Sequence, residues 1–185
     1  IEIELLTDWY LPWRSGLPVP NRDRTDYIEL WTALFAKLQS AEKALVLRDY
    51  HSPNLIWREN RTGLDRLGLI DFQDAMIGPS AYDVASLCQD ARVTIEPDLA
   101  ERLLALYIDD RQSADPAFDG AAFREAYAIM ALQRASKILG IFVRLDQRDG
   151  KPGYLRHLPR IEGYVAQSLQ HPALRPLRSW FTRVG

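Results

Sequence analysis

The side chains best suited to chemistry in this sequence are three polar groups that adjoin short apolar runs. Asp49 comes two residues after one apolar run, and Asn54, five residues later, opens a second run at 55–57. Asp71 directly follows a third run at 67–70. Strands fix the backbone while the loops at their ends stay open to a ligand. We therefore expect these three side chains to share one accessible site.

Phosphoryl transfer is the chemistry that this set fits. It needs an acceptor hydroxyl held in line, a group that accepts the hydroxyl proton, and Mg²⁺ to neutralise the triphosphate charge. An Asp and an Asn five residues apart, followed by an Asp that closes a nearby strand, is the layout of a kinase catalytic loop and its metal-binding Asp. Hard oxygen ligands suit Mg²⁺. We expect Asp49 to accept the proton, Asn54 and Asp71 to hold Mg²⁺, and ATP to be the donor.

Two longer segments, LRDYHSPNLIW at 47–57 and GLIDFQDAMIGPSAYDVASL at 68–87, resemble the aminoglycoside phosphotransferase branch of the protein-kinase-like superfamily. That branch has a loop of the form H-G-D-x-H-x-x-N, which this sequence matches from the Asp onward. It departs at Leu47 and Arg48, where the branch has His and Gly. Within the branch, these two segments are most similar to the sequences of bacterial cell-wall sugar kinases. Those enzymes phosphorylate N-acetylmuramate and N-acetylglucosamine at the anomeric hydroxyl.

The resemblance also implies supporting roles around the catalytic loop. Arg48 and His51 would support the loop, and Asp83 would accept hydrogen bonds from its backbone. Considered one at a time, Asp49, His51 and Asp83 could each have an ordinary structural role instead. Asp49 could cap a turn, His51 could be a packed core histidine, and Asp83 could complement the positive end of a helix.

Three further residues, Asp74, Arg134 and Lys137, are candidates for contacting the acceptor. Asp74 follows Asp71 by three residues and could assist the metal, contact the acceptor or simply be solvated. Arg134 and Lys137 fall on the apolar stripe of a predicted helix, where burying an unpaired cation is costly. Either the stripe turns outward there, or the cations meet an anion. That anion is a protein carboxylate, or a carboxylate or phosphate of the substrate, such as the lactyl group of muramate.

The pattern of elements predicts an α+β protein that is mostly α, with the three apolar runs as short strands. Asp26 with Glu29, and separately Ser80, are placed as N-terminal helix caps. A break is expected at Pro12. The helical patterns cover 1–13, a long segment after Asn21, 80–92, a segment from Pro97, 121–145, 154–169 and 174–181. With the resemblance, this is the plan of a protein-kinase-like C-terminal lobe.

The parts of a kinase that cover the nucleotide are missing from the sequence. There is no glycine-rich phosphate loop, and the first lysine, Lys37, falls on a predicted helix. We therefore expect residues 1–185 to be the lobe that carries the catalytic loop, the metal ligands and the acceptor site, with its own N-terminal lobe upstream. This chain alone should transfer little phosphate. The face towards the other lobe should be apolar near Trp13, Ala44 and Leu55.

Composition limits the class of protein further. With 185 residues, of which 47% are hydrophobic and 26% charged, the chain can bury a globular core. A net charge of −2 gives no reason to expect nucleic acid as a partner. A single cysteine, Cys88, excludes an intramolecular disulfide. No 18-residue apolar run is apparent, so we expect a cytoplasmic protein without a membrane partner.

The sequence thus predicts a kinase that uses ATP and Mg²⁺ to phosphorylate a small-molecule hydroxyl, with an N-acetylated amino sugar as acceptor and cell-wall sugar recycling as its role. Another acceptor, such as an aminoglycoside, choline or homoserine, is one alternative. A kinase-derived binding module without turnover is another, against which the intact Asp49, Asn54 and Asp71 argue. A hydrolase function has little support. No Ser lies in a G-x-S-x-G turn, and Cys88 falls on the apolar face of a predicted helix.

Overall fold

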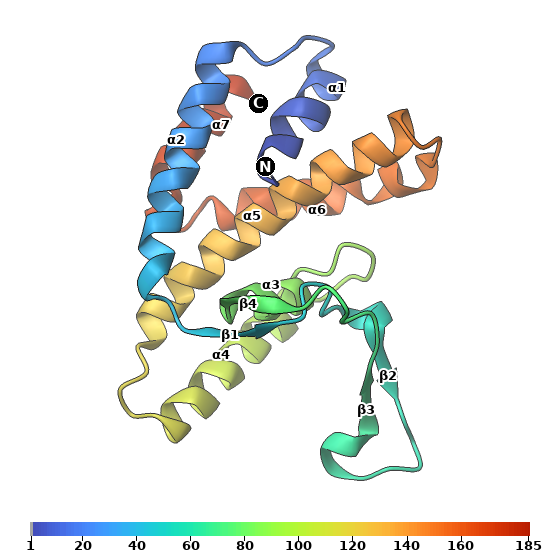
Figure 1. Cartoon of the computed structure of the whole chain (residues 1–185), viewed down its shortest axis with the longest axis vertical. Coiled ribbons are helices and arrows are strands. Elements are labelled where there is room, and N and C mark those ends of the chain that lie inside the picture. The colour runs from blue at the N-terminus through green and yellow to red at the C-terminus, as the bar shows by residue number, and fades with distance from the viewer. Residues whose placement is uncertain (1) are drawn as a thin grey trace. The chain divides into compact units, whose positions relative to one another are not determined.

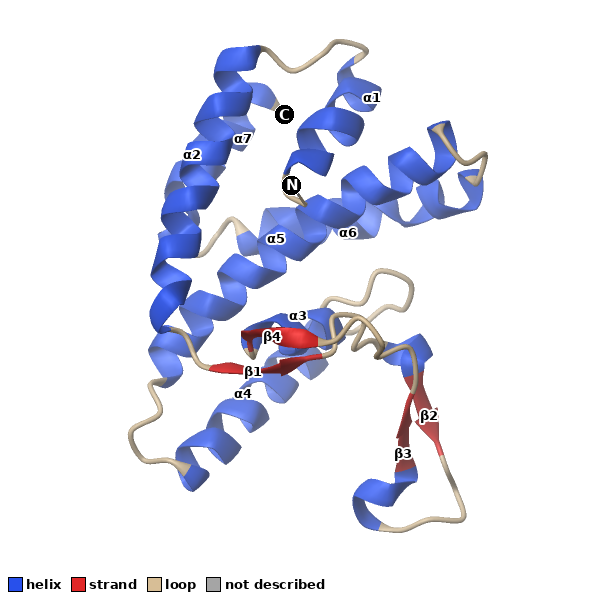
Figure 2. Cartoon of the chain, in the orientation of Figure 1, coloured by secondary structure: helices blue, strands red, loops and turns tan. Residues whose placement is uncertain are grey.

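The computed structural model describes residues 2–185, so Ile1, which begins the first predicted helix, lies outside the described residues. Within them the chain is mostly helical, with a few short strands, as predicted (Figures 1 and 2). The chain divides into two compact units. The first unit is Ile1–Ser40 with Ala128–Gly185, and the second unit is Ala41–Tyr127. The predicted catalytic residues Asp49, Asn54 and Asp71 all belong to the second unit.

The strands of the second unit form two antiparallel pairs. They are β1 (Lys43–Val46), β2 (Leu55–Trp57), β3 (Leu67–Leu69) and β4 (Met76–Pro79). β1 pairs with β4, while β2 and β3 form a hairpin in which Leu55 lies opposite Leu69. The three strands predicted from apolar runs are all present. β4 was missed because its sequence contains Gly and Pro, which disfavour strands; here the pairing with β1 makes it a strand all the same.

Two helices complete the second unit: α3 (Ala81–Cys88) and α4 (Pro97–Ala114), with the first turns of α5 (Gly120–Gln147). α4 begins at the proline, as predicted. Ser80 precedes α3 but does not cap it, because its hydroxyl donates to Glu42 Oε2 at 2.6 Å. α3 also stops short of Arg92, because the side chain of Asp90 accepts the Arg92 N–H and turns the chain away.

The first unit is a helical assembly that is built from the two ends of the chain. It contains a π-helix (Leu6–Tyr10), α1 (Leu11–Ser15), α2 (Asn21–Lys37), the remainder of α5, α6 (Leu158–Ser168) and α7 (Arg175–Val184). The break expected at Pro12 is absent, because proline is tolerated in the first turn of a helix and α1 continues to Ser15. The helix predicted from Tyr154 starts instead with 3-10 turns, Pro152–His157.

The cap expected at Asp26 and Glu29 was wrong. α2 begins five residues earlier, directly after Pro20, whose extended backbone ends the preceding loop. Asp26 lies within the helix and pairs with Arg183 of α7 at 2.8 Å. In the sequence, an acid that caps a helix looks the same as an acid on the surface of a helix. The ion pair with Arg183 shows that Asp26 is of the second kind.

α2 and α7 lie side by side in the first unit, and aromatic side chains hold them together (Figure 1). Tyr27, Trp31 and Trp180 are fully or almost fully buried. The rings of Tyr27 and Trp180 are 4.5 Å apart between centroids, and the indole N–H of Trp180 donates to the Asp23 carbonyl at 2.9 Å. These rings bury large apolar areas, and the hydrogen bond of Trp180 adds a polar link between the two helices, so together they fix this pair of helices.

α5 is long and apolar enough to cross a bilayer on length and composition alone, although no apolar run of that length was expected. However, 83% of its most apolar window is buried within the protein. Burial in the core therefore accounts for its apolar character.

Candidate active site

The loop between β1 and β2 is folded back on itself by bonds within its own backbone. The N–H of Asp49 donates to Leu47 O at 2.8 Å, that of His51 to Asp49 O at 3.0 Å, and that of Asn54 to His51 O at 2.9 Å. Arg48 has a φ of 68°, in the left-handed region, which costs a residue other than Gly roughly 1–3 kcal/mol. This is the position at which the resembling pattern has Gly. An external contact must therefore hold the loop in this conformation.

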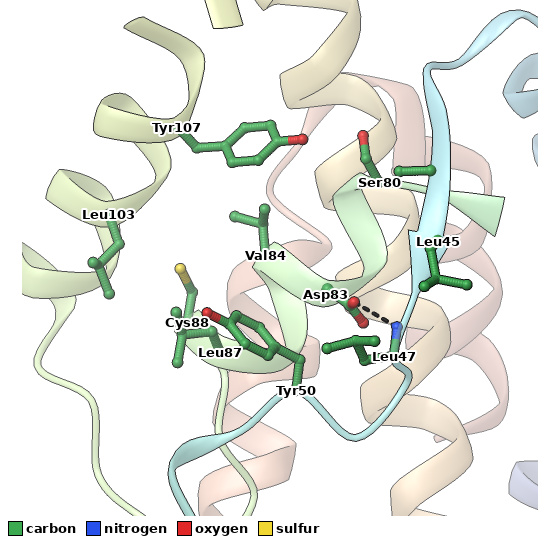
Figure 3. Close-up of a pocket in the computed structure, with 11 residues that line it drawn as sticks. Leu45, Leu47, Tyr50, Ser80, Asp83, Val84, Leu87, Cys88, Leu103 and Tyr107 are labelled. Carbon is green, nitrogen blue, oxygen red and sulfur yellow. Dashed lines mark hydrogen bonds between the residues drawn. The ribbon is translucent and has the colours of Figure 1, made fainter. Parts of the chain in front are cut away.

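Asp83, in the first turn of α3, supplies that contact. Its Oδ2 accepts the N–H of Leu47 at 2.6 Å, and its Oδ1 accepts the N–H of Arg48 at 3.0 Å. Figure 3 shows the first of these bonds, with the carboxylate turned from the helix towards the strand end. Hydrogen bonds to an ionised acceptor are the strong ones, and two of them converge here on the strained peptide. Asp83 thus combines both expected roles, as a first-turn acid and as the acceptor for the loop.

We expect Asp83→Ala to lower the free energy of unfolding by about 3 kcal/mol, because it leaves two loop N–H groups without their acceptor. Asp83→Asn, which keeps one acceptor oxygen, should lose about half as much. Urea unfolding measures both changes. Asp98→Asn is the matched control, since Asp98 is an exposed acid in the first turn of α4 and should cost at most about 0.5 kcal/mol. Equal effects of Asp83→Ala and Asp98→Asn would contradict this role of Asp83.

Asn54 and Asp71 lie at adjoining strand ends, at the open end of the β2–β3 hairpin. The N–H of Ile70 donates to Asn54 O at 3.2 Å, which extends the strand pairing by one step and places the two side chains on neighbouring strand ends. Asn54 Nδ2 donates to Asp49 O at 2.9 Å, and Asp71 Oδ1 accepts from Gln73 Nε2 at 2.7 Å. Asp71 also has a left-handed backbone, with a φ of 62°. Left-handed residues of this kind cluster at functional sites.

These donors fit a magnesium ion. Among residues 2–185 there is no cluster of three or more His, Cys, Asp or Glu side chains able to hold a metal. Mg²⁺ does not require one, because it keeps several waters and is bound by one or two protein oxygens together with substrate phosphates. Within the described chain, no hydrogen bond uses Asn54 Oδ1 or Asp71 Oδ2. The carboxylate of Asp49, an exposed residue, likewise accepts none from residues 2–185.

Behind the loop lies a buried carboxylate that sequence reasoning missed. Asp90 is fully buried; its Oδ1 accepts the N–H of Arg92 and Val93 at 2.8 and 3.0 Å, and its Oδ2 accepts that of Ser52 at 2.9 Å. Burial alone would raise the pKa of Asp90, but these hydrogen bonds outweigh it and hold the pKa below its usual value. His51, itself buried, places Nδ1 4.0 Å from Asp90 Oδ2. The sequence did contain one sign of this residue, because Asp90 is a charged residue that directly follows the apolar segment of α3.

An apolar pocket of about 370 Å³ adjoins the same loop (Figure 3). Leu47 and Tyr50, which flank Arg48 and Asp49 in sequence, form one wall, and residues of α3 and α4 form the others. Burial raises the pKa of the Cys88 thiol, in the α3 wall, to about 11. Cys88 is therefore protonated at neutral pH and offers no nucleophile, which agrees with the absence of a hydrolase pattern.

The three candidates for contacting the acceptor are distributed over both units. Asp74 is exposed between β3 and β4 of the second unit. Arg134 and Lys137 belong to the first unit, on α5, and Arg134 is only 6% exposed. Lys137 Nζ lies 3.5 Å from Glu2 Oε2, so this cation meets a protein carboxylate. Of the two anions considered for Lys137, a protein carboxylate or a substrate group, the structure shows the protein carboxylate.

The second unit leaves large apolar side chains exposed on its strands. Ala44 is exposed and Leu55 is half-buried, whereas Trp13, which is 39% exposed, belongs to the first unit. The exposed large apolar residues of the strands are Leu45, Ile56, Trp57, Leu67, Leu69, Met76 and Ile77. This exposed apolar area lies in the unit that carries the predicted catalytic loop.

A mostly helical chain in which short strands deliver an Asp–Asn–Asp set to one loop region is the arrangement of kinase-like phosphotransferases. Comparison of the sequence with known families agrees, since the profile of the phosphotransferase enzyme family matches residues 3–117. The chain belongs to this family.

Curated relatives narrow the comparison. The chain is 38% identical over 154 residues to an N-acetylmuramate/N-acetylglucosamine kinase of Caulobacter vibrioides, covering 83% of this chain and 41% of the relative. Kinases of the same name from Pseudomonas putida and Pseudomonas aeruginosa are 33% and 32% identical, over 95% of this chain and 51% and 52% of the relatives. The chain spans about half the length of the curated relatives it matches.

Proposed function

We propose that this chain is part of a kinase that transfers the γ-phosphoryl group of ATP to the anomeric hydroxyl of N-acetylmuramate or N-acetylglucosamine. The observation that supports kinase chemistry is the placement of Asn54 and Asp71 at adjoining strand ends of the hairpin, with the Asn54 amide bonded to the backbone of Asp49. The choice of acceptor rests on the names of the relatives. A cytoplasmic protein that recycles cell-wall sugars is the setting that such an activity implies.

In the proposed reaction, Asp49 receives the proton of the acceptor hydroxyl. The hydroxyl oxygen forms a bond to the γ-phosphorus while the bond from that phosphorus to the bridging oxygen breaks, which yields the sugar phosphate and ADP. Asn54 and Asp71 would hold Mg²⁺, which would supply positive charge that neutralises the phosphates. Asp83 keeps the loop in the conformation that presents Asp49.

We further propose that residues 1–185 form the C-terminal lobe of a two-lobed kinase. The sequence has no glycine-rich loop to bind phosphates through backbone N–H groups, and the chain matches only about half of each relative. An upstream N-terminal lobe would supply these groups and a phosphate-binding Lys, and it would cover exposed apolar side chains such as Leu45 and Trp57. The protein extended upstream to the length of the relatives is called the extended protein below.

The acceptor is tested with a substrate panel. We expect the extended protein to release ADP from ATP and Mg²⁺ with N-acetylmuramate or N-acetylglucosamine, and far more slowly with an aminoglycoside, choline or homoserine. The 185-residue chain, assayed in parallel, should show no comparable turnover, because catalysis of this kind consists of positioning and electrostatics that the chain supplies only in part.

Each part of the proposal has its own contrary result. Strong activity on an aminoglycoside with none on either sugar would contradict the acceptor and leave the kinase chemistry in place. Equal turnover by the short and extended proteins would contradict the division into lobes. A protein that binds a nucleotide and phosphorylates nothing in the panel would favour the binding module.

A further inference from the structure

Asp90, His51 and Asn54 form a row that leads from the interior of the second unit to the proposed metal site. Asp90 is fully buried, and His51 is 7% exposed. Nδ1 of His51 lies 4.0 Å from Asp90 Oδ2, and Nε2 of the same ring lies 3.4 Å from Asn54 Nδ2. The imidazole therefore has a carboxylate near one nitrogen and a carboxamide nitrogen near the other.

These neighbours determine which ring nitrogen of His51 carries the proton. Three backbone N–H groups fix the Asp90 carboxylate and favour its ionised form. A lone pair on Nδ1 would face this anion and be repelled, whereas an Nδ1–H group is attracted to it. The lone pair then resides on Nε2, opposite Asn54 Nδ2. A carboxamide nitrogen can only donate, so this is the one tautomer of the neutral ring that suits both neighbours.

The row has a consequence for the Asn54 amide. One hydrogen of Nδ2 is donated to Asp49 O at 2.9 Å, and the other points to the lone pair of His51 Nε2. With both hydrogens engaged on the loop, Oδ1 is the atom left for a ligand. With the proton on Nε2 instead, two N–H groups would face each other, which favours a flipped amide that offers nitrogen to the metal.

We propose that Asp90 is a positioning residue that holds His51 as the Nδ1–H tautomer, and that His51 thereby holds the Asn54 amide with its oxygen towards the metal. The inference rests on the proposed function, because it takes Asn54 as a metal ligand. It assigns His51 a specific task, unlike that of a packed core histidine. Replacing a histidine that only fills space would change stability without changing metal affinity.

Nitrogen NMR of the full 185-residue chain reads the tautomer directly. At a pH where the imidazoles are neutral, we expect the His51 proton on Nδ1. His171 is an internal reference with the opposite tautomer, because its Nδ1 accepts the Ala173 N–H at 3.3 Å. The side-chain amide protons of Asn54 should also exchange with solvent more slowly than those of Asn60, which lies in an exposed loop.

A pair of variants tests the step from the ring to the metal. His51→Leu removes the acceptor at Nε2, whereas His51→Gln can place an amide oxygen near the same point with its NH₂ group on the side of Asp90. Mn²⁺ binding to the extended protein with a non-hydrolysable ATP analogue should weaken about 10–100-fold in His51→Leu, as for other groups that orient a metal ligand. His51→Gln should recover most of this loss. Asp90→Asn should reduce the Nδ1–H form of His51.

The outcomes separate this inference from the proposed function. A wild-type His51 that carries its proton on Nε2 would overturn the inference, and so would equal losses of Mn²⁺ affinity in the Leu and Gln variants. If Asp90→Asn does not fold, the wild-type spectrum and the His51 pair still decide. An extended protein that phosphorylates no acceptor, with the NMR and Mn²⁺ results as expected, would contradict the proposed function while supporting the positioning row.

Discussion

Asp49→Asn should lower kcat of the extended protein by about 10²–10⁴-fold, the range for losing a positioned general base. The variant keeps the shape of the side chain and removes its ability to take a proton. Because no hydrogen bond within residues 2–185 uses the carboxylate, the loop geometry and the free energy of unfolding should be unchanged. Binding of ATP should therefore survive. Steady-state kinetics with the preferred sugar, together with nucleotide binding, measure the two effects separately.

Two comparisons make the result specific to Asp49. Asp65→Asn changes an exposed acid in the turn before β3 and should leave kcat as it is. His51→Ala should lower kcat less than Asp49→Asn does, because the task of His51 is positioning. If His51→Ala were the more damaging of the two, the histidine and not Asp49 would be the base.

Gly140→Ala should lower the free energy of unfolding by about 3 kcal/mol or more, because the added methyl group has nowhere to go. Gly140 lies in α5 of the first unit, where a Cβ would come 2.7 Å from Leu5 Cβ and still closer to the Leu5 carbonyl. The obstacle is backbone, so no side-chain rotation can relieve it. Either α5 or the segment before the π-helix has to move, which loosens the packing between the two ends of the chain.

Gly163→Ala is the matched control, since Gly163 is exposed in α6 and a Cβ there would meet nothing within 4 Å. That substitution should stabilise the protein by about 0.5–1 kcal/mol, because alanine is the better helix former. Urea or thermal unfolding of the full chain compares the two variants. A neutral Gly140→Ala would show that the N-terminal segment does not pack against α5 as described.

The sequence alone determined the strands β1 to β3 and the start of α4, and it singled out Asp49, Asn54 and Asp71 as the candidate set. The reason is that each depends on residues close in the chain. An apolar run bounded by turn residues predicts a strand, and a proline predicts the first turn of a helix. The spacing of Asp49 and Asn54 is likewise fixed within one short loop, so their meeting can be predicted without knowing what packs around them.

The tertiary structure decided which distant residues contact the loop that carries Asp49, and which partners the other charged residues find. Asp83 reaches Leu47 across 36 residues, Asp90 reaches Ser52 across 38, and Lys137 finds Glu2 across 135. β4 becomes a strand through its pairing with β1, and Ser80 binds Glu42 instead of capping α3. A buried polar group must find a partner, but the sequence does not say which one. Chain folding decides which acids and donors become neighbours, so the family resemblance was needed to anticipate Asp83, and the buried Asp90 behind the loop could be derived only from the structure.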